Sequence, residues 1–200
     1  MSPKSLKFIV LFSVGFLVGL IGDYFHITSK TTFYNPDYIG FKILESAWWF
    51  PFATALAAVT LGFLHQGLQL KLDPQAVQNK VSLVRCLMAL LAFLGLYALS
   101  AYPLFSNLLL HDGMMLLLAL AFWLFLRPTK TVFILSLSVA LIGTSIEIIQ
   151  VRSGWFGYYP KGNEFFGVAI WTPFAYFASV PAIAALVQYL DQKSTVCRDL

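Results

Sequence analysis

The chain has 200 residues, of which 59% are hydrophobic and only 11% are charged, and its formal net charge is +4. A water-soluble domain carries about 25% charged residues, so the composition excludes an ordinary cytosolic enzyme. The thirteen Lys and Arg residues are scattered singly, which excludes the basic stripe of a nucleic-acid-binding protein. Two cysteines, Cys86 and Cys197, are too few for a disulfide framework. The composition therefore predicts an integral membrane protein.

Six long stretches contain no charged residue: 8–22, 46–64, 86–110, 113–126, 131–146 and 165–190. A helix that crosses a bilayer needs about 20 residues. We therefore expect an all-α, polytopic membrane protein in which one domain, residues 1–200, contains six transmembrane helices. Their expected spans are near 8–27, 46–65, 86–104, 107–126, 131–150 and 168–190. The first stretch has no small-residue cleavage site after it, so it predicts an uncleaved span rather than a signal peptide.

The positive charges between the predicted spans are unevenly divided. Nine Lys and Arg residues lie on the side that carries both termini, and four lie on the other side. Cytoplasmic loops carry an excess of positive charge, so this division predicts that both termini are cytoplasmic. The nine are Lys4, Lys7, Lys71, Lys80, Arg85, Arg127, Lys130, Lys193 and Arg198.

The first, fourth and fifth stretches are too short to cross the hydrocarbon, and polar residues must complete them. Extending each to about 20 residues brings ionisable side chains into three helices at a similar depth, about one turn below the outer surface. Because a carboxylate or imidazole that faces lipid is costly, we expect these groups to turn inward around a polar pocket. They are Asp23 and His26 in the first helix, His111 and Asp112 in the fourth, and Glu147 and Gln150 in the fifth.

Two alternatives apply to these residues. In the first alternative, these residues lie at the membrane interface and only end their helices, since helix tilt and local thinning of the bilayer can accommodate a short span. A metal site is the other alternative, but the side chains come from separate helices without local ligand spacing, so we predict neither a metal nor a cofactor.

The polar layer belongs to an apparent internal repeat. Asp23-x-x-His26 and Tyr34-x-Pro36 recur 124 residues later as Glu147-x-x-Gln150 and Tyr158-x-Pro160, and Trp49-x-Pro51 recurs as Trp171-x-Pro173. Spans one and two therefore correspond to five and six, in a parallel repeat. An aromatic belt at the interface is the alternative explanation of the tryptophans. Gly15-x-x-x-Gly19 predicts a close helix contact, within the chain or between two copies.

Several of these motifs resemble the insulin-induced gene (Insig) family of six-span membrane proteins. They are Ser46-Ala47-Trp48-Trp49-x-Pro51, Leu61-Gly62-x-Leu64, Val84-Arg85-Cys86, Asp23-x-x-His26-Ile27 and Val151-x-x-Gly154-x-x-x-Tyr158. The resemblance implies a bundle that binds sterols or other lipids. In animal cells the family retains a sterol-sensing escort protein in the endoplasmic reticulum, and prokaryotic relatives are associated with diacylglycerol-like lipids. This chain looks like a compact prokaryotic-type member, in the inner membrane or alternatively the endoplasmic reticulum, and it differs from the animal pattern at its charged positions.

The leading hypothesis is a cavity among spans one, two, five and six that binds a sterol, diacylglycerol or isoprenoid-type lipid and opens to the outer leaflet. The expected ligand-binding residues are Asp23, His26, Tyr34, Trp49, His111, Asp112, Glu147, Gln150, Tyr158 and Trp171. The alternative is an intramembrane hydratase or isomerase that acts on an isoprenoid or carotenoid lipid, with Asp23, Glu147 and Asp112 as its acids and bases. A transporter is a third candidate. The expected partners are the membrane lipid and a second copy or another membrane protein, and no nucleic acid.

Overall fold

The computed structural model describes residues 2–78, 80–126, 129–160 and 165–196. Its six long helices confirm the predicted six-helix membrane bundle, and each is long and apolar enough to cross a membrane. They are α1 (Pro3–Thr28), α3 (Trp49–Leu72), α4 (Leu83–Ala101), α5 (Leu108–Phe125), α6 (Lys130–Arg152) and α7 (Thr172–Val196). Arg127, Lys161, Cys197 and Arg198, which entered the charge and cysteine arguments, lie outside the described residues.

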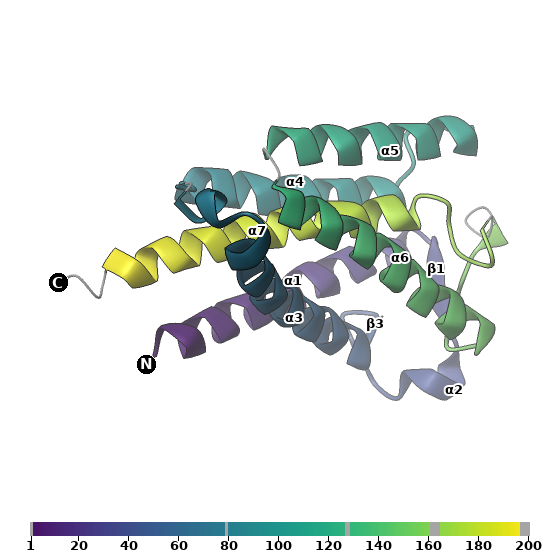
Figure 1. Ribbon diagram of the computed structural model, residues 1–200. Coiled ribbons are helices and arrows are strands. Elements are labelled where there is room, and N and C mark those ends of the chain that lie inside the picture. The colour runs from purple at the N-terminus through teal and green to yellow at the C-terminus, as the bar shows by residue number, and fades with distance from the viewer. Residues whose placement is uncertain (1, 79, 127–128, 161–164, 197–200) are drawn as a thin grey trace.

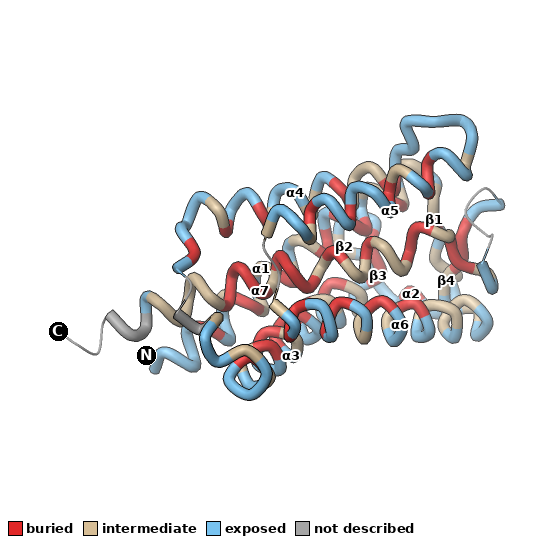
Figure 2. Tube along the Cα trace, turned by 45° about the horizontal axis from the view of Figure 1, so that its top comes forward, coloured by how far each residue is buried: buried red, intermediate tan, exposed pale blue. Residues whose placement is uncertain are grey.

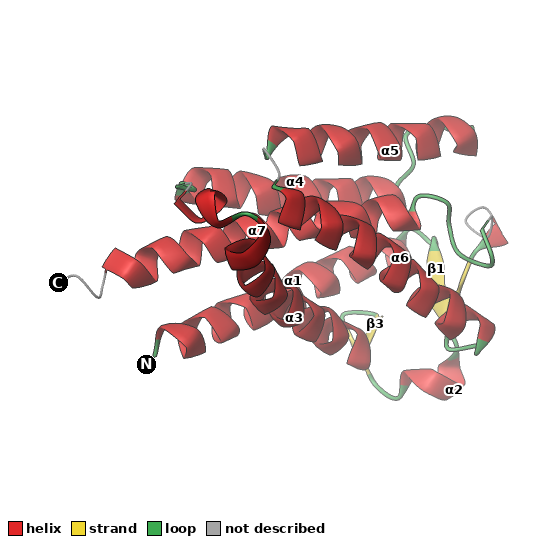
Figure 3. Ribbon diagram, in the orientation of Figure 1, coloured by secondary structure: helices red, strands yellow, loops and turns green. Residues whose placement is uncertain are grey.

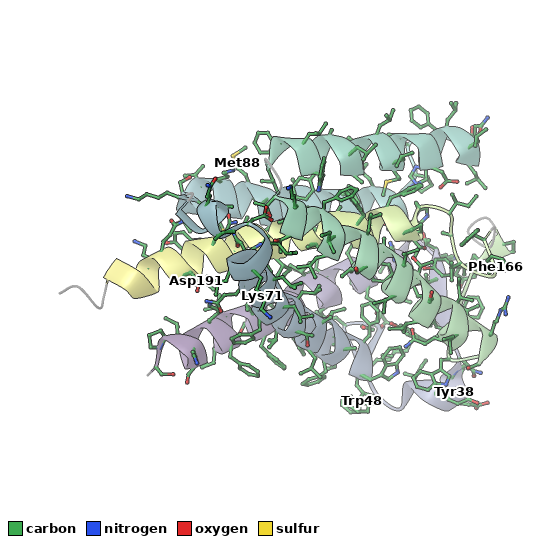
Figure 4. The ribbon with its side chains drawn as sticks, viewed as in Figure 1. Tyr38, Trp48, Lys71, Met88, Phe166 and Asp191 are labelled. Carbon is green, nitrogen blue, oxygen red and sulfur yellow. The ribbon has the colours of Figure 1, made fainter. Side chains whose placement is uncertain are left out.

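Short elements connect the helices. The strands are β1 (Thr32–Tyr34), β2 (Lys42–Ile43), β3 (Ser46–Ala47) and β4 (Phe156–Tyr158), and the short helices are α2 (Pro36–Ile39) and a 3-10 turn over Pro74–Gln78. Figure 1 shows both termini at one end of the bundle, and Figure 3 shows the strands at the other. We call these the terminal end and the strand end. In Figure 4, Tyr38 and Trp48 lie at the strand end, and Lys71 and Asp191 lie toward the terminal end.

Side-chain caps mark where most of the helices begin. Ser2, Ser82, Asn107 and Thr129 each accept a hydrogen bond from a backbone N–H in the first turn of α1, α4, α5 and α6. These caps satisfy donors that have no partner within the helix. At α6 a distant residue adds a second cap, because Asp73 accepts hydrogen bonds of 2.7 Å from both the N–H and the hydroxyl of Thr131. Asp73 thereby ties the end of α3 to the start of α6.

Helix α7 is the central helix of the bundle. In the apolar segment with which α7 would cross the membrane, 56% of the residues are buried, against 33% or less in the corresponding segments of the other helices. Buried residues are red in Figure 2, and they follow one another along α7. The buried face of α7 consists largely of alanines, such as Ala178, Ala182 and Ala185. Small side chains let several helices approach α7 closely. Helix α5, by contrast, exposes leucines such as Leu109 and Leu117, as expected of a face in contact with lipid.

Helices α1 and α3 pack closely through Gly15 and Gly19. A Cβ on Gly15 would lie 2.6 Å from Ala58 Cβ, and a Cβ on Gly19 would collide with the Thr54 hydroxyl. That hydroxyl donates a hydrogen bond of 3.1 Å to the Gly15 carbonyl. The Gly15-x-x-x-Gly19 motif therefore serves packing within the chain.

A two-stranded ladder joins the two halves of the predicted repeat at the strand end. Strand β1 pairs antiparallel with β4 in the register Thr32 to Tyr158, Phe33 to Gly157 and Tyr34 to Phe156. The central pair, Phe33 and Gly157, consists of positions 124 residues apart, so the ladder is symmetric with respect to the repeat offset. The ladder accords with the repeat at this one place, and the correspondence of the helices stays a prediction.

The terminal end contains a buried ion pair that the charge count did not anticipate. Lys7, assigned above to a cytoplasmic segment, is 6% exposed and lies within α1, where its ammonium pairs with Asp191 of α7. His65 and Gln69 of α3 are also buried, and among the described residues both ring nitrogens of His65 lack a hydrogen-bond partner. The bundle therefore has buried polar groups at both ends.

Candidate functional site

Two carboxylates at the strand end are held by tyrosines in the same way. Tyr34 donates a hydrogen bond of 2.7 Å to Asp23 Oδ2, and Tyr158 donates one of 3.0 Å to Glu147 Oε2. Each tyrosine follows its acid by eleven residues in the sequence. In both cases the helix that carries the acid ends in a turn, and the turn leads into the strand that carries the tyrosine, β1 or β4. The Ser46 side chain also lies next to Asp23. The two connections thus bring both acids, from α1 and α6, to the same end of the bundle.

The two tyrosines remain hydrogen-bond donors over the whole physiological range. Burial, together with the negative charge of Asp23, raises the pKa of the Tyr34 hydroxyl. Burial and the charge of Glu147 likewise raise the pKa of Tyr158. A protonated phenol next to a carboxyl group fixes the position of that group, because the donor holds one oxygen and leaves the other to accept from a different partner.

His26 connects α1 to α4 and to the start of α7. Its Nε2 lies 2.9 Å from the Ser100 hydroxyl, and its ring packs against the rings of Tyr97, at 4.9 Å between centroids, and Trp171, at 5.1 Å. These contacts bury the imidazole to 5% exposure. His26 therefore faces the interior, as the sequence predicted, rather than lipid.

A cavity of about 180 Å³ lies between α1, α3, α4, α6 and α7, and we call it the central cavity. Its walls are mainly apolar, with Val18, Leu61, Val139 and Ile183 among the lining residues. Polar side chains also line it: His26, Tyr97, Glu147, Thr172, Tyr176 and Ser179. Gly15, Gly19 and several alanines, such as Ala57 and Ala175, are also among the lining residues. The cavity thus combines an apolar interior with hydrogen-bonding groups.

Three of the ten predicted ligand-binding residues line the central cavity: His26, Glu147 and Trp171. Asp23, Tyr34 and Tyr158 lie next to its polar residues, since Asp23 interacts electrostatically with Glu147 and the Tyr158 and Trp171 rings lie 6.1 Å apart. Trp49 packs on the Tyr34 ring at 5.8 Å, and Gln150 is half-buried outside the lining.

The fourth span does not reach the central cavity. His111 and Asp112 are buried in the first two turns of α5, but α5 packs on α4 and α7 at the outside of the bundle (Figure 1). His111 and Asp112 are not among the residues that line the central cavity, so a ligand-binding role for them stays a prediction. Helix α4 lines the central cavity and contributes the polar residue Tyr97.

Sequence reasoning missed Tyr97, Thr172 and Tyr176. Each is a hydroxyl-bearing residue in a mainly apolar span, and its polarity was the signal that could have identified it. Tyr176 hydrogen-bonds to Glu147, and this contact depends on the way α6 packs against α7. Within the ranges that the structure describes, no three His, Cys, Asp or Glu side chains form a group that could hold a metal.

Comparisons with known proteins show that the chain is similar to Insig proteins, although no family model matches it. It is 29% identical over 179 residues to the INSIG protein homolog of Mycolicibacterium vanbaalenii, covering 90% of this chain and 83% of that protein. It is 27% identical over 189 residues to the insulin-induced gene 1 protein of Danio rerio, covering 94% and 73%.

The fold is similar as well. The crystal structure of the mycobacterial Insig homolog from Mycobacterium vanbaalenii matches with a TM-score of 0.81 and 28% identity over 92% of both chains. A second structure, of a cross-linked trimer of a cysteine variant of that homolog, matches with the same TM-score. The similarity thus extends over nearly the whole bundle, and the chain is an Insig-like six-helix membrane protein.

Proposed function

We propose that the central cavity binds the head of a neutral, hydroxyl-bearing membrane lipid, with sterols, diacylglycerols and isoprenoid-type lipids as the candidate classes. The observation that supports this proposal is the Glu147 carboxyl group, which lines a mainly apolar cavity beside the Tyr176 and Tyr97 side chains. A lipid hydroxyl can donate a hydrogen bond to Glu147 while the adjoining carbons lie against the apolar walls.

The charge at this end of the cavity favours a neutral head over an anionic one. Asp23 and Glu147 are close enough to interact electrostatically. A phosphate placed beside two carboxyl groups would meet like charge in a region of low dielectric. A hydroxyl head has no such penalty. The volume of about 180 Å³ is below the about 300 Å³ of pockets that enclose a drug-sized ligand. We therefore expect the cavity to take the head and its nearest carbons, with the chain extending between helices.

Native mass spectrometry of the full chain in mild detergent tests the proposal. The unaltered protein is expected to retain a neutral lipid. The variant with both Asp23→Ala and Glu147→Ala is expected to lose it by about ten-fold, because the acceptor of the lipid hydroxyl and the neighbouring carboxyl group are both removed. Glu147→Gln should retain an intermediate amount, because the amide oxygen still accepts. Glu45→Ala is the matched control, since Glu45 is an exposed acid at the same end. Equal retention by the double variant and the control would contradict the proposal.

A second variant separates ligand loss from misfolding. Ala182 lines the cavity and is 1% exposed, so Ala182→Leu fills part of the space and leaves every polar group in place. Ala121→Leu places the same side chain on an exposed position of α5. We expect loss of lipid from the first variant only. A full lipid complement in a folded Ala182→Leu protein would also contradict the proposal.

Catalysis on an isoprenoid or carotenoid lipid is the second candidate function, and the position of Glu147 in the cavity lining favours it. Among its three proposed acids, Glu147 lines the cavity, Asp23 lies close by, and Asp112 belongs to α5. Incubation of the purified protein with candidate polyenes tests this candidate. Turnover that disappears in Glu147→Gln would support it, and no turnover of any polyene would count against it.

We further propose that the terminal end faces the cytoplasm. Of the described cations, Lys4, Lys71, Lys80, Arg85, Lys130 and Lys193 lie at helix ends on that side, whereas Lys30, Lys42 and Arg152 lie at the strand end. This imbalance follows the positive-inside rule. Labelling of single cysteines introduced at Lys71 and Lys42 with a membrane-impermeant reagent tests it, and labelling of the Lys71 position from outside intact cells would reverse the orientation. A homo-oligomer, as in the cross-linked trimer of the relative, is also proposed.

A further inference from the structure

A second cavity, of about 230 Å³, lies at the terminal end, and we call it the basic pocket. It is bounded by Lys80 and Val81 before α4, by Arg85 in the first turn of α4, by Thr129 before α6, and by α7. It shares no residue with the central cavity.

The shape of the basic pocket depends on α7. Gln188 lines it on that side, together with Pro181, Ala184 and Ala185. Pro181, Ala184 and Ala185 carry small side chains, and Pro181 lies inside the helix, where it cannot donate the usual backbone hydrogen bond. A recess thus opens beside the central helix at the level of the helix ends.

The charge of the basic pocket is positive. Lys80 and Arg85 line it, and no acidic residue does so among the described residues. The half-buried Arg85 is positioned by its backbone N–H, which donates to the Ser82 hydroxyl at 3.2 Å, and by its guanidinium, which donates to the Phe125 carbonyl at 3.4 Å. A guanidinium has five N–H donors in a planar fork, so one such contact leaves several donors for a ligand. The starts of α4 and α6 flank the pocket, and helix N-termini add partial positive charge.

We propose that the basic pocket binds a phosphate group through Lys80 and Arg85. Arginine forms paired hydrogen bonds to phosphate oxygens, and lysine adds a point charge. Basic recesses between transmembrane helices on the cytoplasmic side are suited to anionic lipid heads. The apolar part of the lining, Val81, Leu126 and Val132, offers a surface for the carbons next to the phosphate. The phosphate group belongs either to an anionic phospholipid of the inner leaflet or to a soluble phosphate compound.

The full chain, reconstituted in vesicles of phosphatidylcholine with a minor fraction of spin-labelled phosphatidylglycerol, tests the proposal. The variant with both Lys80→Gln and Arg85→Gln is expected to bind the labelled lipid about ten-fold more weakly, because two charge-assisted contacts are lost. The matched control is Lys4→Gln with Lys71→Gln, which removes the same charge from two exposed residues outside the pocket. Arg85→Lys should recover part of the binding.

Addition of inorganic phosphate distinguishes the two sources. Binding of phosphate to the detergent-solubilised protein, lost in the Lys80 and Arg85 variant and able to displace the labelled lipid, would assign the site to a soluble phosphate compound. Lipid binding that phosphate does not displace would assign it to the phospholipid. An equal fall in both double variants would show that only overall charge matters, and no fall in either would show that the pocket is not used. Both of these last results overturn the proposal.

Discussion

The Tyr34 hydroxyl donates a hydrogen bond of 2.7 Å to Asp23 across the end of α1, and the Tyr158 hydroxyl makes the equivalent bond to Glu147 at the end of α6. In each case the acid is in the last two turns of a membrane helix and the tyrosine is in the strand that follows. The bond therefore determines how the chain leaves the helix as well as how the carboxyl group is oriented.

Replacing either tyrosine by phenylalanine should destabilise the protein. Tyr34→Phe and Tyr158→Phe each remove the donor to a buried carboxyl group, which costs about 1–3 kcal/mol. We expect the lower part of this range, since Ser46 lies next to Asp23 and Tyr176 still hydrogen-bonds to Glu147. Thermal unfolding in detergent measures the effect. Tyr38→Phe is the control, because Tyr38 is 49% exposed, and equal melting temperatures for all three variants would contradict the prediction.

The contact between α1 and α3 predicts a sharp difference between glycines. Gly15→Leu should lower the free energy of unfolding by about 1–3 kcal/mol, because its side chain meets the Ala55 and Thr54 backbone. Gly67→Ala and Gly95→Ala should be neutral or slightly stabilising, since a Cβ there meets nothing within 4 Å and alanine favours the helix. Denaturation curves check the ranking, and a neutral Gly15→Leu would show that the helices do not pack as described.

The ion pair of Lys7 and Asp191 predicts an asymmetric response to substitution. The Lys7 side chain is 7% exposed and that of Asp191 is 34% exposed. Asp191→Asn removes the negative partner of a buried ammonium, which costs about 3 kcal/mol. Lys7→Met leaves a carboxylate that water can reach, so we expect a loss of about 1 kcal/mol. Melting temperatures of the two variants and of the exposed control Lys4→Met give the comparison, and the opposite order would refute the argument.

The cap of α6 by Asp73 predicts a dependence on acid pH. Burial alone would raise the pKa of Asp73, but the two hydrogen bonds from Thr131, one from Thr129 and the charge of Lys130 together lower it below the ordinary 3.8. A carboxyl group whose pKa is lowered by folding stabilises the protein above that ordinary value, and the stabilisation is lost as the pH falls through the lowered pKa. Asp73→Asn should therefore reduce stability at neutral pH by about 1 kcal/mol.

The comparison of pH profiles separates this cap from a general loss of packing. As the pH falls below 3.8 and through the lowered pKa of Asp73, the stability difference between the Asp73→Asn variant and the unaltered chain should shrink, because the acid becomes protonated first in the unfolded and then in the folded protein. Asp37→Asn is the control, since Asp37 is exposed in α2 at the strand end. A difference that stays constant from pH 7 to pH 3 would contradict the role of the Asp73 charge.

The six crossings were predictable from the sequence because the length of an apolar stretch is a local property. The inward positions of His26 and Glu147 could also be predicted from their own segments. A short apolar stretch must be extended by polar residues to cross the bilayer, and these residues avoid lipid. The spacing of eleven residues between each acid and its tyrosine was visible as a repeat. The hydrogen bond within each pair was not, because it depends on how the chain turns after the helix.

The sequence alone determined what each segment is, and the tertiary structure decided which segments meet. Packing made α7 the central helix, placed α5 outside, buried Lys7 against a residue 184 positions away, and brought Tyr97 and Tyr176 into the central cavity. Each of these outcomes depends on contacts between side chains that are distant in the sequence. In lipid, apolar surfaces of different helices are nearly equivalent, so the choice of neighbours depends on close packing of small residues and on a few polar contacts, which hydropathy does not encode.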